Sequence, residues 1–184
     1  MILHFVTKNR HKVQEVEELL SGLDIKVTPV PLEIREIQTA ETNDIVRDKV
    51  LKAFRHVGRP VFVEHTGLYI GALGGFPGGL TQVFWDKLKA DMFSSLLGRL
   101  DDPSVTAKTI IAYCDAKRIH IFDGSVDGRI AETPAGDRSF QWDCVFIPSG
   151  YSETFAELGN VKNQISMRKR AFDKFKKYLE KERL

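Results

Sequence analysis

The chain has 184 residues, 42% of them hydrophobic, which is enough for one sizeable core and too short for two comfortable domains. We therefore predict a single domain over residues 1–184. The 27 basic and 25 acidic residues give a formal net charge of +2. This balance argues against a dedicated nucleic-acid binder but is compatible with a small anionic ligand.

The cysteines and the apolar runs indicate the cellular compartment in which the protein is expected. Cys114 and Cys144 lie in apolar, strand-like stretches without metal-ligand spacing, so we expect reduced thiols and neither a disulfide scaffold nor a zinc site. The first apolar residues soon meet basic residues, and no apolar run approaches membrane-spanning length. The sequence predicts a soluble cytoplasmic protein with no membrane partner.

The N-terminal residues predict a strand, Ile2–Val6, followed by a helix over 11–20. The polar loop between them carries Thr7, Asn9 and Lys12. A strand that continues through a short loop into a helix leaves backbone N–H groups at the helix N-terminus, and that place favours anions. A phosphate site is one interpretation, and a helix cap with solvated lysines is the other.

Residues 25–30 predict a second strand, which leads into an acidic segment containing Glu36. The Glu36 carboxylate is a candidate metal ligand, although an isolated glutamate is more often solvated at an edge. Residues 43–56 then show the helical period, and Thr42 or Asn43 is the expected N-cap.

The apolar residues 61–63 predict a buried strand that runs into Glu64 and His65. Because Thr66-Gly67 is typical of a turn, we expect these two polar residues at the end of the strand, where open α/β sheets place their sites. The glycine-rich loop 74–79 permits positive φ angles and a close approach of backbone to ligand. The alternative is an ordinary strand followed by a wide turn.

The rest of the chain predicts two helices and a hairpin. Residues 80–100 predict a helix whose buried stripe includes Met92 and Leu96, and residues 166–184 predict an amphipathic helix with a solvated basic face. Strands over 105–115 and 119–130 form a hairpin of a mixed sheet. In its second arm, Gly124 and Gly128 predict bulges or twists.

Two aromatic residues and a carboxylate, Phe140, Trp142 and Asp143, precede another apolar run. Such a group favours a stacking platform with a hydrogen-bond acceptor for a flat ligand. Core aromatics with a surface aspartate are the alternative.

Short motifs along nearly the whole chain occur in an order and at intervals that match one known family. They are Thr7-x-Asn9-x-x-Lys12, Glu36-Ile37-Gln38, the strand Val61 to Glu64 with Thr66-Gly67-Leu68, residues 72–78, Phe140-x-Trp142-Asp143, residues 154–158, and Lys162 followed by Ser166-x-Arg168. Together they resemble the inosine/xanthosine triphosphate pyrophosphatase family. Each motif alone is weak, and their combination is specific.

The resemblance implies an elongated α/β fold with a mixed sheet, two lobes, a central active-site cleft and assembly as a homodimer. It implies hydrolysis of a nucleoside or deoxynucleoside triphosphate, including non-standard purine nucleotides, to the monophosphate and pyrophosphate. The implied cofactor is a divalent metal, expected to be Mg²⁺.

The resemblance also assigns roles to residues. It implies that Thr7, Asn9 and Lys12 hold the triphosphate, and that Glu36 and Glu64, with the residue after Glu64, bind the metal and activate water. The residues that it places around the base and sugar are Phe140, Trp142, Asp143, Lys162, Ser166, Met167 and Arg168.

His65 departs from the family, which carries an aspartate at this position. Mg²⁺ prefers oxygen ligands, so an imidazole weakens its site. With an unperturbed pKa of about 6.5, His65 is able to act as a general base. It is equally able to ligate a softer ion such as Mn²⁺, Co²⁺ or Ni²⁺, or to mark an inactive site, and the sequence leaves all three interpretations open.

Two further departures surround the implied base site. Met167 replaces a histidine donor thought to read the 6-oxo group of the purine, and a thioether donates no hydrogen bond. Because a site that hydrogen-bonds a substrate group discriminates most strongly against analogues lacking it, we expect altered base specificity. Gln141 replaces the usual glycine and adds a polar side chain beside the platform.

Three functions follow as hypotheses. The first is a metal-dependent nucleotide pyrophosphatase of altered specificity, in which Glu36 and Glu64 hold the metal, His65 or the metal activates water, and Lys12 stabilises developing charge. The second is a nucleotide-binding sensor that has lost hydrolysis. The third is a different hydrolytic reaction on a nucleotide in the same pocket.

Overall fold

A computed structural model describes residues 2–181. One seven-stranded mixed sheet has the strand order β2-β1-β3-β5-β6-β7, with β4 paired to β3. The strands are β1 Ile2–Val6, β2 Lys26–Val30, β3 Val61–Ile70, β4 Pro77–Gly78, β5 Ser104–Cys114, β6 Ile119–Ile130 and β7 Phe146–Pro148. The α/β prediction is confirmed.

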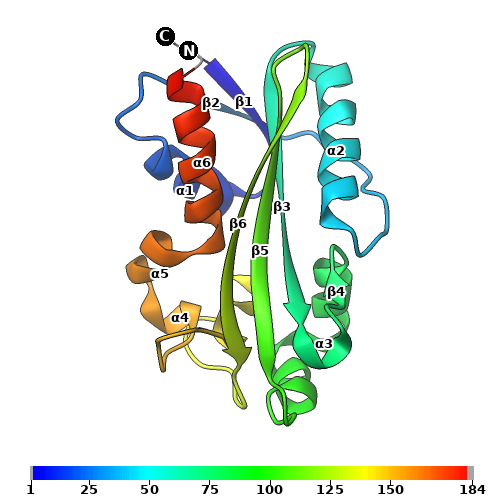
Figure 1. Ribbon diagram of the computed structural model, residues 1–184, viewed down its shortest axis with the longest axis vertical. Helices are drawn as coiled ribbons and strands as arrows, with labels where there is room; N and C mark the ends of the chain where they lie inside the picture. Colours follow the sequence, from blue (N-terminus) through cyan, green and yellow to red (C-terminus); the bar gives the residue numbers. More distant parts are fainter. Residues whose placement is uncertain (1, 182–184) are drawn as a thin grey trace.

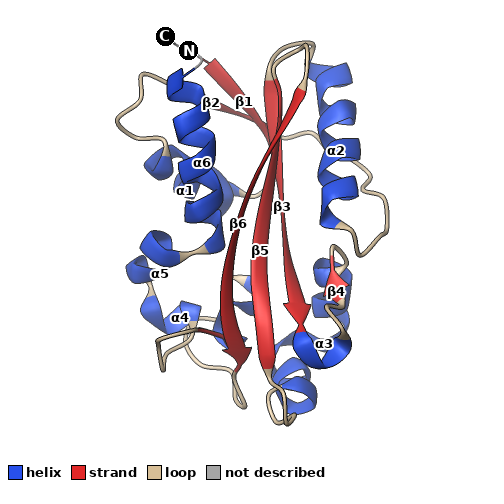
Figure 2. Cartoon of the chain, in the orientation of Figure 1, coloured by secondary structure: helices blue, strands red, loops and turns tan. Residues whose placement is uncertain are grey.

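Helices cover both sides of this sheet (Figure 1). They are α1 Arg10–Leu19, α2 Thr42–Val57, α3 Thr81–Leu97, α4 Phe155–Leu158, α5 Asn160–Ile165 and α6 Met167–Lys181, with short 3₁₀ turns η1 Gly71–Leu73 and η2 Gln141–Val145. Figure 2 shows β3, β5 and β6 as a long twisted spine, with α1 and α6 on one side and α2 on the other. No helix within residues 2–181 is both long enough and apolar enough to cross a membrane.

β3 is longer than the sequence predicts, and the predicted strand end at Glu64 and His65 is wrong. Thr66 and Gly67 do not turn the chain, because they pair with Thr109 and Lys108 of β5 in an antiparallel ladder that continues to Ile70. The parallel neighbour β1, however, pairs only with the first residues of β3. Glu64 and His65 therefore lie in mid-strand, at the point where β3 loses β1 as a neighbour.

Strand alternation sends successive β3 side chains to opposite faces. Phe62 packs with Phe172 and Phe175 in the core beneath α1 and α6. Val61 and Val63 pack instead in the core beneath α2. The same alternation directs Glu64 toward α6 and His65 toward α2.

Gly124 allows α6 to approach the sheet closely. The β5–β6 pairing is unbroken from Ser104↔Arg129 to Cys114↔Ile119, so the predicted bulges at Gly124 and Gly128 are wrong. A Cβ atom on Gly124 would lie 2.2 Å from the carbonyl oxygen of Met167 and 2.5 Å from the backbone nitrogen of Ala171. Glycine thus lets the first turn of α6 rest against β6.

Two helix predictions need correction. Met92 and Leu96 are 53% and 55% exposed, because α3 is interrupted at Lys89 (φ 55°, ψ −178°) and its second half turns a different face inward. The N-cap of α2 is Glu41, without a side-chain cap bond, and not Thr42 or Asn43. The last residues of the predicted C-terminal helix, 182–184, lie outside the described part of the chain.

Candidate functional site

A cleft of about 190 Å³ opens beside the middle of β3. Its walls come from α1, the segment before α2, α2 itself, β3, the start of α3, η2 and the start of α6, so residues far apart in the sequence meet there. The predicted site residues that line it are Lys12, Glu36, Glu64, His65, Phe140, Trp142, Met167 and Arg168.

Glu64 lies at the floor of this cleft, 2% exposed, and is held by two cations. Lys12 Nζ lies 2.9 Å from Glu64 Oε1, and the Arg168 guanidinium donates to both carboxylate oxygens over 3.0 and 3.1 Å. Burial by itself raises the pKa of Glu64, but the charges of Arg168 and Lys12 outweigh it and bring the pKa far below its usual range. Glu64 is therefore a carboxylate, and it fixes α1 and α6 to β3.

The ionic network continues from Arg168 along the cleft wall. Arg168 Nη1 also donates to Glu15, whose other oxygen lies 3.7 Å from Lys162 Nζ. Lys162 in turn donates to Asp143 over 2.5 Å and sits 4.1 Å above the ring of Phe140. Opposite charges alternate along this path, so each buried ion has a partner.

Glu15 is a member of this network that the sequence analysis missed. It lies three residues after Lys12, on the same face of α1. That spacing was the available signal, but only the fold shows that Arg168 and Lys162 meet this face.

A second hollow, of about 390 Å³, lies on the other side of Phe140. Asp143 lines it and is only 4% exposed, so the alternative of a surface aspartate is wrong. Its Oδ1 atom is buried without a hydrogen-bond partner, and burial raises the pKa of Asp143 despite the opposing charge of Lys162. Trp142 is a core side chain packed on Phe146, whereas Phe140 is partly exposed between the two hollows.

His65 faces the α2 side and is 8% exposed. Its Nε2 atom lies 3.0 Å from the carbonyl oxygen of Gly79, and its Nδ1 atom lies 3.5 Å from Glu36 Oε2. Burial lowers the pKa of His65 to about 4, although Glu36 opposes the shift. The ring is thus neutral at pH 7, and the general-base interpretation based on an unperturbed pKa overestimates its basicity.

Lys49 makes the short contact to the Glu36 carboxylate. Lys49 Nζ lies 2.5 Å from Glu36 Oε1 and 3.4 Å from the backbone carbonyl oxygen of Glu64. Burial alone raises the pKa of Glu36, but Lys49 outweighs it and leaves the pKa below the usual value. Across residues 2–181, no three His, Cys, Asp or Glu side chains gather as a ready-made metal site.

The side chains of the predicted phosphate loop lie in two different hollows. Asn9 is the N-cap of α1 and accepts from the Lys12 backbone N–H, while Thr7 accepts from the Asn9 backbone N–H. Thr7 and Asn9 line a separate hollow of about 510 Å³ together with Lys8 and Arg10. The Lys12 ammonium group points instead into the cleft that holds Glu64.

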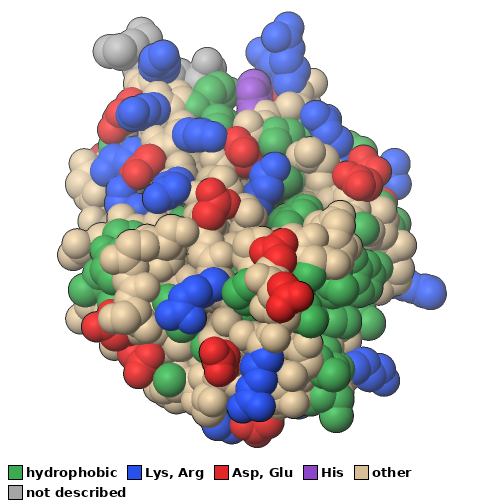
Figure 3. All heavy atoms as spheres, turned by 60° about the horizontal axis from the view of Figure 1, so that its bottom comes forward, with side chains coloured by type: hydrophobic (Ala, Val, Ile, Leu, Met, Phe, Trp, Pro, Cys, Tyr) green, Lys and Arg blue, Asp and Glu red, His purple; other side chains and the backbone are tan. Residues whose placement is uncertain are grey.

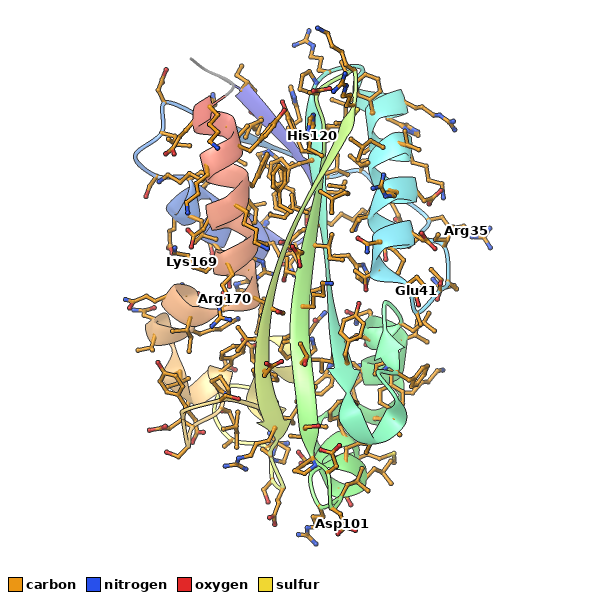
Figure 4. The ribbon with its side chains drawn as sticks, in the orientation of Figure 1. Arg35, Glu41, Asp101, His120, Lys169 and Arg170 are labelled. Atoms are coloured by element: carbon orange, nitrogen blue, oxygen red, sulfur yellow. The ribbon has the colours of Figure 1, made fainter. Side chains whose placement is uncertain are left out.

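The remaining predicted residues lie near the start of α6 and at η2. Ser166 accepts from the Lys169 backbone N–H, and Met167 is 1% exposed at the cleft wall. Figure 4 marks this end of α6 by Lys169 and Arg170. Gln141 has a positive φ of 45° and donates its side-chain N–H to Gln82 at the cleft mouth, so it does add a polar group beside Phe140.

The fold and this cleft define a mixed-sheet α/β protein with a cleft lined by paired basic and acidic side chains. A model of the Ham1 family matches residues 3–178, and the chain belongs to that family. It is 38% identical to a dITP/XTP pyrophosphatase of Ignicoccus hospitalis over 96% of each chain. It is 37% identical to an inosine triphosphate pyrophosphatase of Yarrowia lipolytica over 97% of this chain and 96% of the relative.

Solved structures agree with this assignment. A Ham1 protein from Coxiella burnetii superposes with a TM-score of 0.85 at 27% identity, covering 98% of this chain and 99% of that one. The Ham1 protein of Staphylococcus aureus has a TM-score of 0.81 at 22% identity and supports the fold alone. The family resemblance predicted from the motifs is thus confirmed.

We expect Arg168→Met to destabilise the fold by roughly 3–5 kcal/mol, because it leaves the buried Glu64 carboxylate with Lys12 alone. The free energy of unfolding in urea measures this loss. Replacing Glu64 by Gln in the same chain should restore part of it, since the double variant no longer buries the Glu64 carboxylate, although Lys12 then loses its partner. The exposed Arg170→Met is the control and should change stability by no more than about 0.5 kcal/mol. Equal losses at the two positions would contradict the proposed role of the Arg168–Glu64 pair.

Proposed function

We propose that this protein is a nucleoside-triphosphate pyrophosphatase, which hydrolyses a nucleoside or deoxynucleoside triphosphate to the monophosphate and pyrophosphate. The observation that carries the proposal is the cleft itself, in which Lys12 and Lys49 lie with the Glu36 carboxylate beside the ring of Phe140. Ammonium groups suit the phosphates, and an aromatic face suits the base. The relatives named as dITP/XTP and inosine triphosphate pyrophosphatases support the same reaction.

A divalent metal is the expected cofactor. When bound, such an ion neutralises phosphate charge and lowers the pKa of a water molecule. Glu36 fits as a ligand because Lys49 contacts only one of its oxygens. Glu64 is the other predicted ligand, and its carboxylate oxygens contact Lys12 and Arg168. Mg²⁺ is the family expectation, and Mn²⁺ or a softer ion suits His65 better.

The chain's own residues position the substrate in this proposal. Lys12 stabilises negative charge that develops on the phosphates, with Thr7 and Asn9 holding the triphosphate tail. Phe140 stacks on the base, and the unpartnered Asp143 Oδ1 accepts a hydrogen bond from a base N–H group. The remaining residues that enclose base and sugar are Trp142, Lys162, Ser166, Met167 and Arg168.

Met167 determines how far the specificity departs from that of the relatives. Its buried thioether offers no hydrogen-bond donor to a 6-oxo group. We therefore propose that this enzyme discriminates less between 6-oxo purines and other bases than a site with a donor at this position. Gln82 and Gln141, which line the same cleft, supply side-chain amide groups.

The proposed activity is tested by pyrophosphate release from a panel containing dITP, XTP and the standard nucleoside triphosphates, with Mg²⁺ and Mn²⁺ in parallel. We expect turnover of at least one nucleotide. Phe140→Ala should lower kcat/KM by about 10- to 100-fold, because base–aromatic stacking contributes roughly 1–3 kcal/mol. Tyr151→Ala, at a 39% exposed ring outside the cleft lining, is the matched control.

Nucleotide binding without any turnover would favour the sensor hypothesis, and products other than pyrophosphate would favour a different hydrolase. Either result would contradict the proposed reaction. Calorimetry with a hydrolysis-resistant analogue and mass spectrometry of the products distinguish the two.

We also propose that the protein acts in the cytoplasm, consistent with its free cysteines, and that it forms a homodimer through an apolar surface on η1 and α3. The exposed side chains of this surface are Leu73, Phe76, Val83, Met92, Leu96 and Leu100. Figure 3 shows hydrophobic side chains gathered on one flank of the molecule. Gathered exposed apolar side chains are typical of protein–protein interfaces.

Sedimentation measures the homodimer directly. We expect a dimer for the natural protein and a monomer for Leu96→Glu, because a charge at the centre of an apolar contact is left desolvated. Val161→Glu, at an exposed apolar residue of α5, should remain a dimer. A monomeric natural protein, or a dimeric Leu96→Glu variant, would contradict this surface.

A further inference from the structure

The helix α3 is broken at Lys89, and the break turns polar side chains of both its halves toward one hollow. Lys89 has φ 55° and ψ −178°, a combination close to the region that is essentially restricted to glycine. In an unbroken helix, Asp91 would lie about 140° around the axis from Asp86, because successive residues turn by about 100°. Both carboxylates nevertheless line one hollow of about 390 Å³ together with Gln82, which we call the α3 hollow. The break therefore brings Asp91 to the side of α3 that carries Gln82 and Asp86.

The loop of residues 137–141 forms the other wall of the α3 hollow, and two bridges join it to α3. Arg138 Nη1 lies 3.1 and 3.0 Å from the two carboxylate oxygens of Asp91. The side-chain N–H group of Gln141 donates to Gln82. One bridge thus reaches each half of the broken helix.

Asp86 fixes the direction of the bridge between the two glutamine side chains. A carboxylate accepts hydrogen bonds and donates none, so the Gln82 N–H group, 2.9 Å away, donates to Asp86. Lys89 Nζ lies 2.9 Å from the other oxygen of Asp86. The Gln82 side-chain oxygen is therefore the group that accepts from Gln141. The four side chains form one directed chain of hydrogen bonds from the loop to the break in α3.

Gln141 makes this bridge in a backbone conformation that costs free energy. Its φ of 45° lies in the left-handed region, which favours glycine. Strained residues of this kind persist where the surrounding structure requires them, and they cluster at ligand sites. Gln82 and Gln141 line both the nucleotide cleft and the α3 hollow, so the bridge between them separates these two spaces.

Phe140 precedes Gln141, and its ring has contacts from two other helices. Lys162 Nζ of α5 lies 4.1 Å from the centre of the ring. The ring of His11 in α1 meets it edge-on, with the ring centres 5.9 Å apart. The bridges to α3 hold the loop from a third direction. A ring that is held in place before a ligand arrives loses less conformational freedom when the ligand binds.

We propose that Gln82 and Asp91 are positioning residues for the base platform. By fastening the loop 137–141 to the two halves of α3, they hold Phe140 where a nucleotide base stacks on its ring. The inference rests on the proposed function in one respect, because it takes the ligand to be a nucleotide whose base lies on Phe140. Loss of a bridge should therefore weaken recognition of the base and leave recognition of the phosphates unchanged.

Calorimetry on the full chain, with Mg²⁺ present, tests this with a hydrolysis-resistant analogue of dITP and with inorganic tripolyphosphate, which has the phosphates without a base. Gln82→Ala should weaken nucleotide binding by about 3- to 10-fold, the size of one hydrogen bond, and tripolyphosphate binding by less than about 2-fold. Gln164→Ala, at an exposed glutamine of α5, is the control and should bind both ligands like the natural protein. Unchanged nucleotide affinity in Gln82→Ala, or equal losses for the two ligands, would overturn the proposal.

Gln141→Gly separates the bridge from the stability of the fold. Glycine adopts the positive φ without strain, so the thermal unfolding midpoint should stay equal or rise while nucleotide affinity falls as in Gln82→Ala. Because the two residues act through one hydrogen bond, the double variant should bind the nucleotide no more weakly than either single variant. Additive losses, or a lower unfolding midpoint in Gln141→Gly, would contradict the role of this bridge.

A charge exchange tests the second bridge. Arg138→Asp should weaken nucleotide binding by about 2- to 5-fold, because two carboxylates then face each other where an exposed ion pair stood. Asp91→Arg in the same chain should restore the affinity, since the pair forms again with its charges exchanged. No loss in Arg138→Asp, or no recovery in the double variant, would overturn the role of Asp91.

The proposed function and the positioning role fail in different ways. Weaker nucleotide binding in Gln82→Ala, with no pyrophosphate release from any nucleotide by the natural protein, would overturn the function alone. Pyrophosphate release by the natural protein, with unchanged nucleotide affinity in Gln82→Ala, would overturn the positioning role alone. A natural protein that binds no nucleotide would overturn both.

Discussion

The buried carboxylate of Glu64 is the constraint on which the site depends. An unpaired carboxylate in the middle of a buried strand costs several kcal/mol, so the fold has to bring cations to it. Lys12 comes from α1 and Arg168 from α6, and both reach the same carboxylate. Gly124 makes this possible, because it lets the first turn of α6 lie directly against β6. The ionic network is therefore a structural device that also shapes the floor of the cleft.

The side chains of β3 point alternately to the two faces of the sheet, and this alternation divides the site into two halves. Glu64 turns toward α6 and joins the cationic network, whereas His65 turns toward α2 and meets Glu36. A single pair of neighbouring residues thus supplies a fixed anion on one face and a neutral nitrogen donor on the other.

Local sequence patterns were sufficient for the class of fold and for most elements. The strand and helix periods placed β1, β5 and β6 within a residue or two of their observed bounds. They failed for β3, because Thr66-Gly67 has turn composition and only its pairing with β5 makes it a strand. They located α3 but placed Met92 and Leu96 wrongly on its buried face, because the interruption at Lys89 has no signature in the hydrophobic pattern.

The sequence was sufficient to predict which residues form the candidate site, but not how they pair or how their pKa values shift. The motifs named Lys12, Glu64 and Arg168, but their mutual pairing depends on contacts between residues far apart in the chain. The lowered pKa of His65 follows from burial, and its tautomer follows from the Gly79 carbonyl, so neither is visible in the sequence. The family resemblance predicted roles for these residues, and the structure shows their burial and their contacts.

The central claim is that this cleft binds the substrate nucleotide, and its most direct measurement is a crystal structure with a hydrolysis-resistant nucleoside triphosphate. Our account predicts the base stacked on Phe140 and the phosphates beside Lys12 and Lys49, with the Arg168–Glu64 pair intact. A nucleotide bound outside this cleft, with Phe140 and Lys12 making no contact to it, would contradict the account.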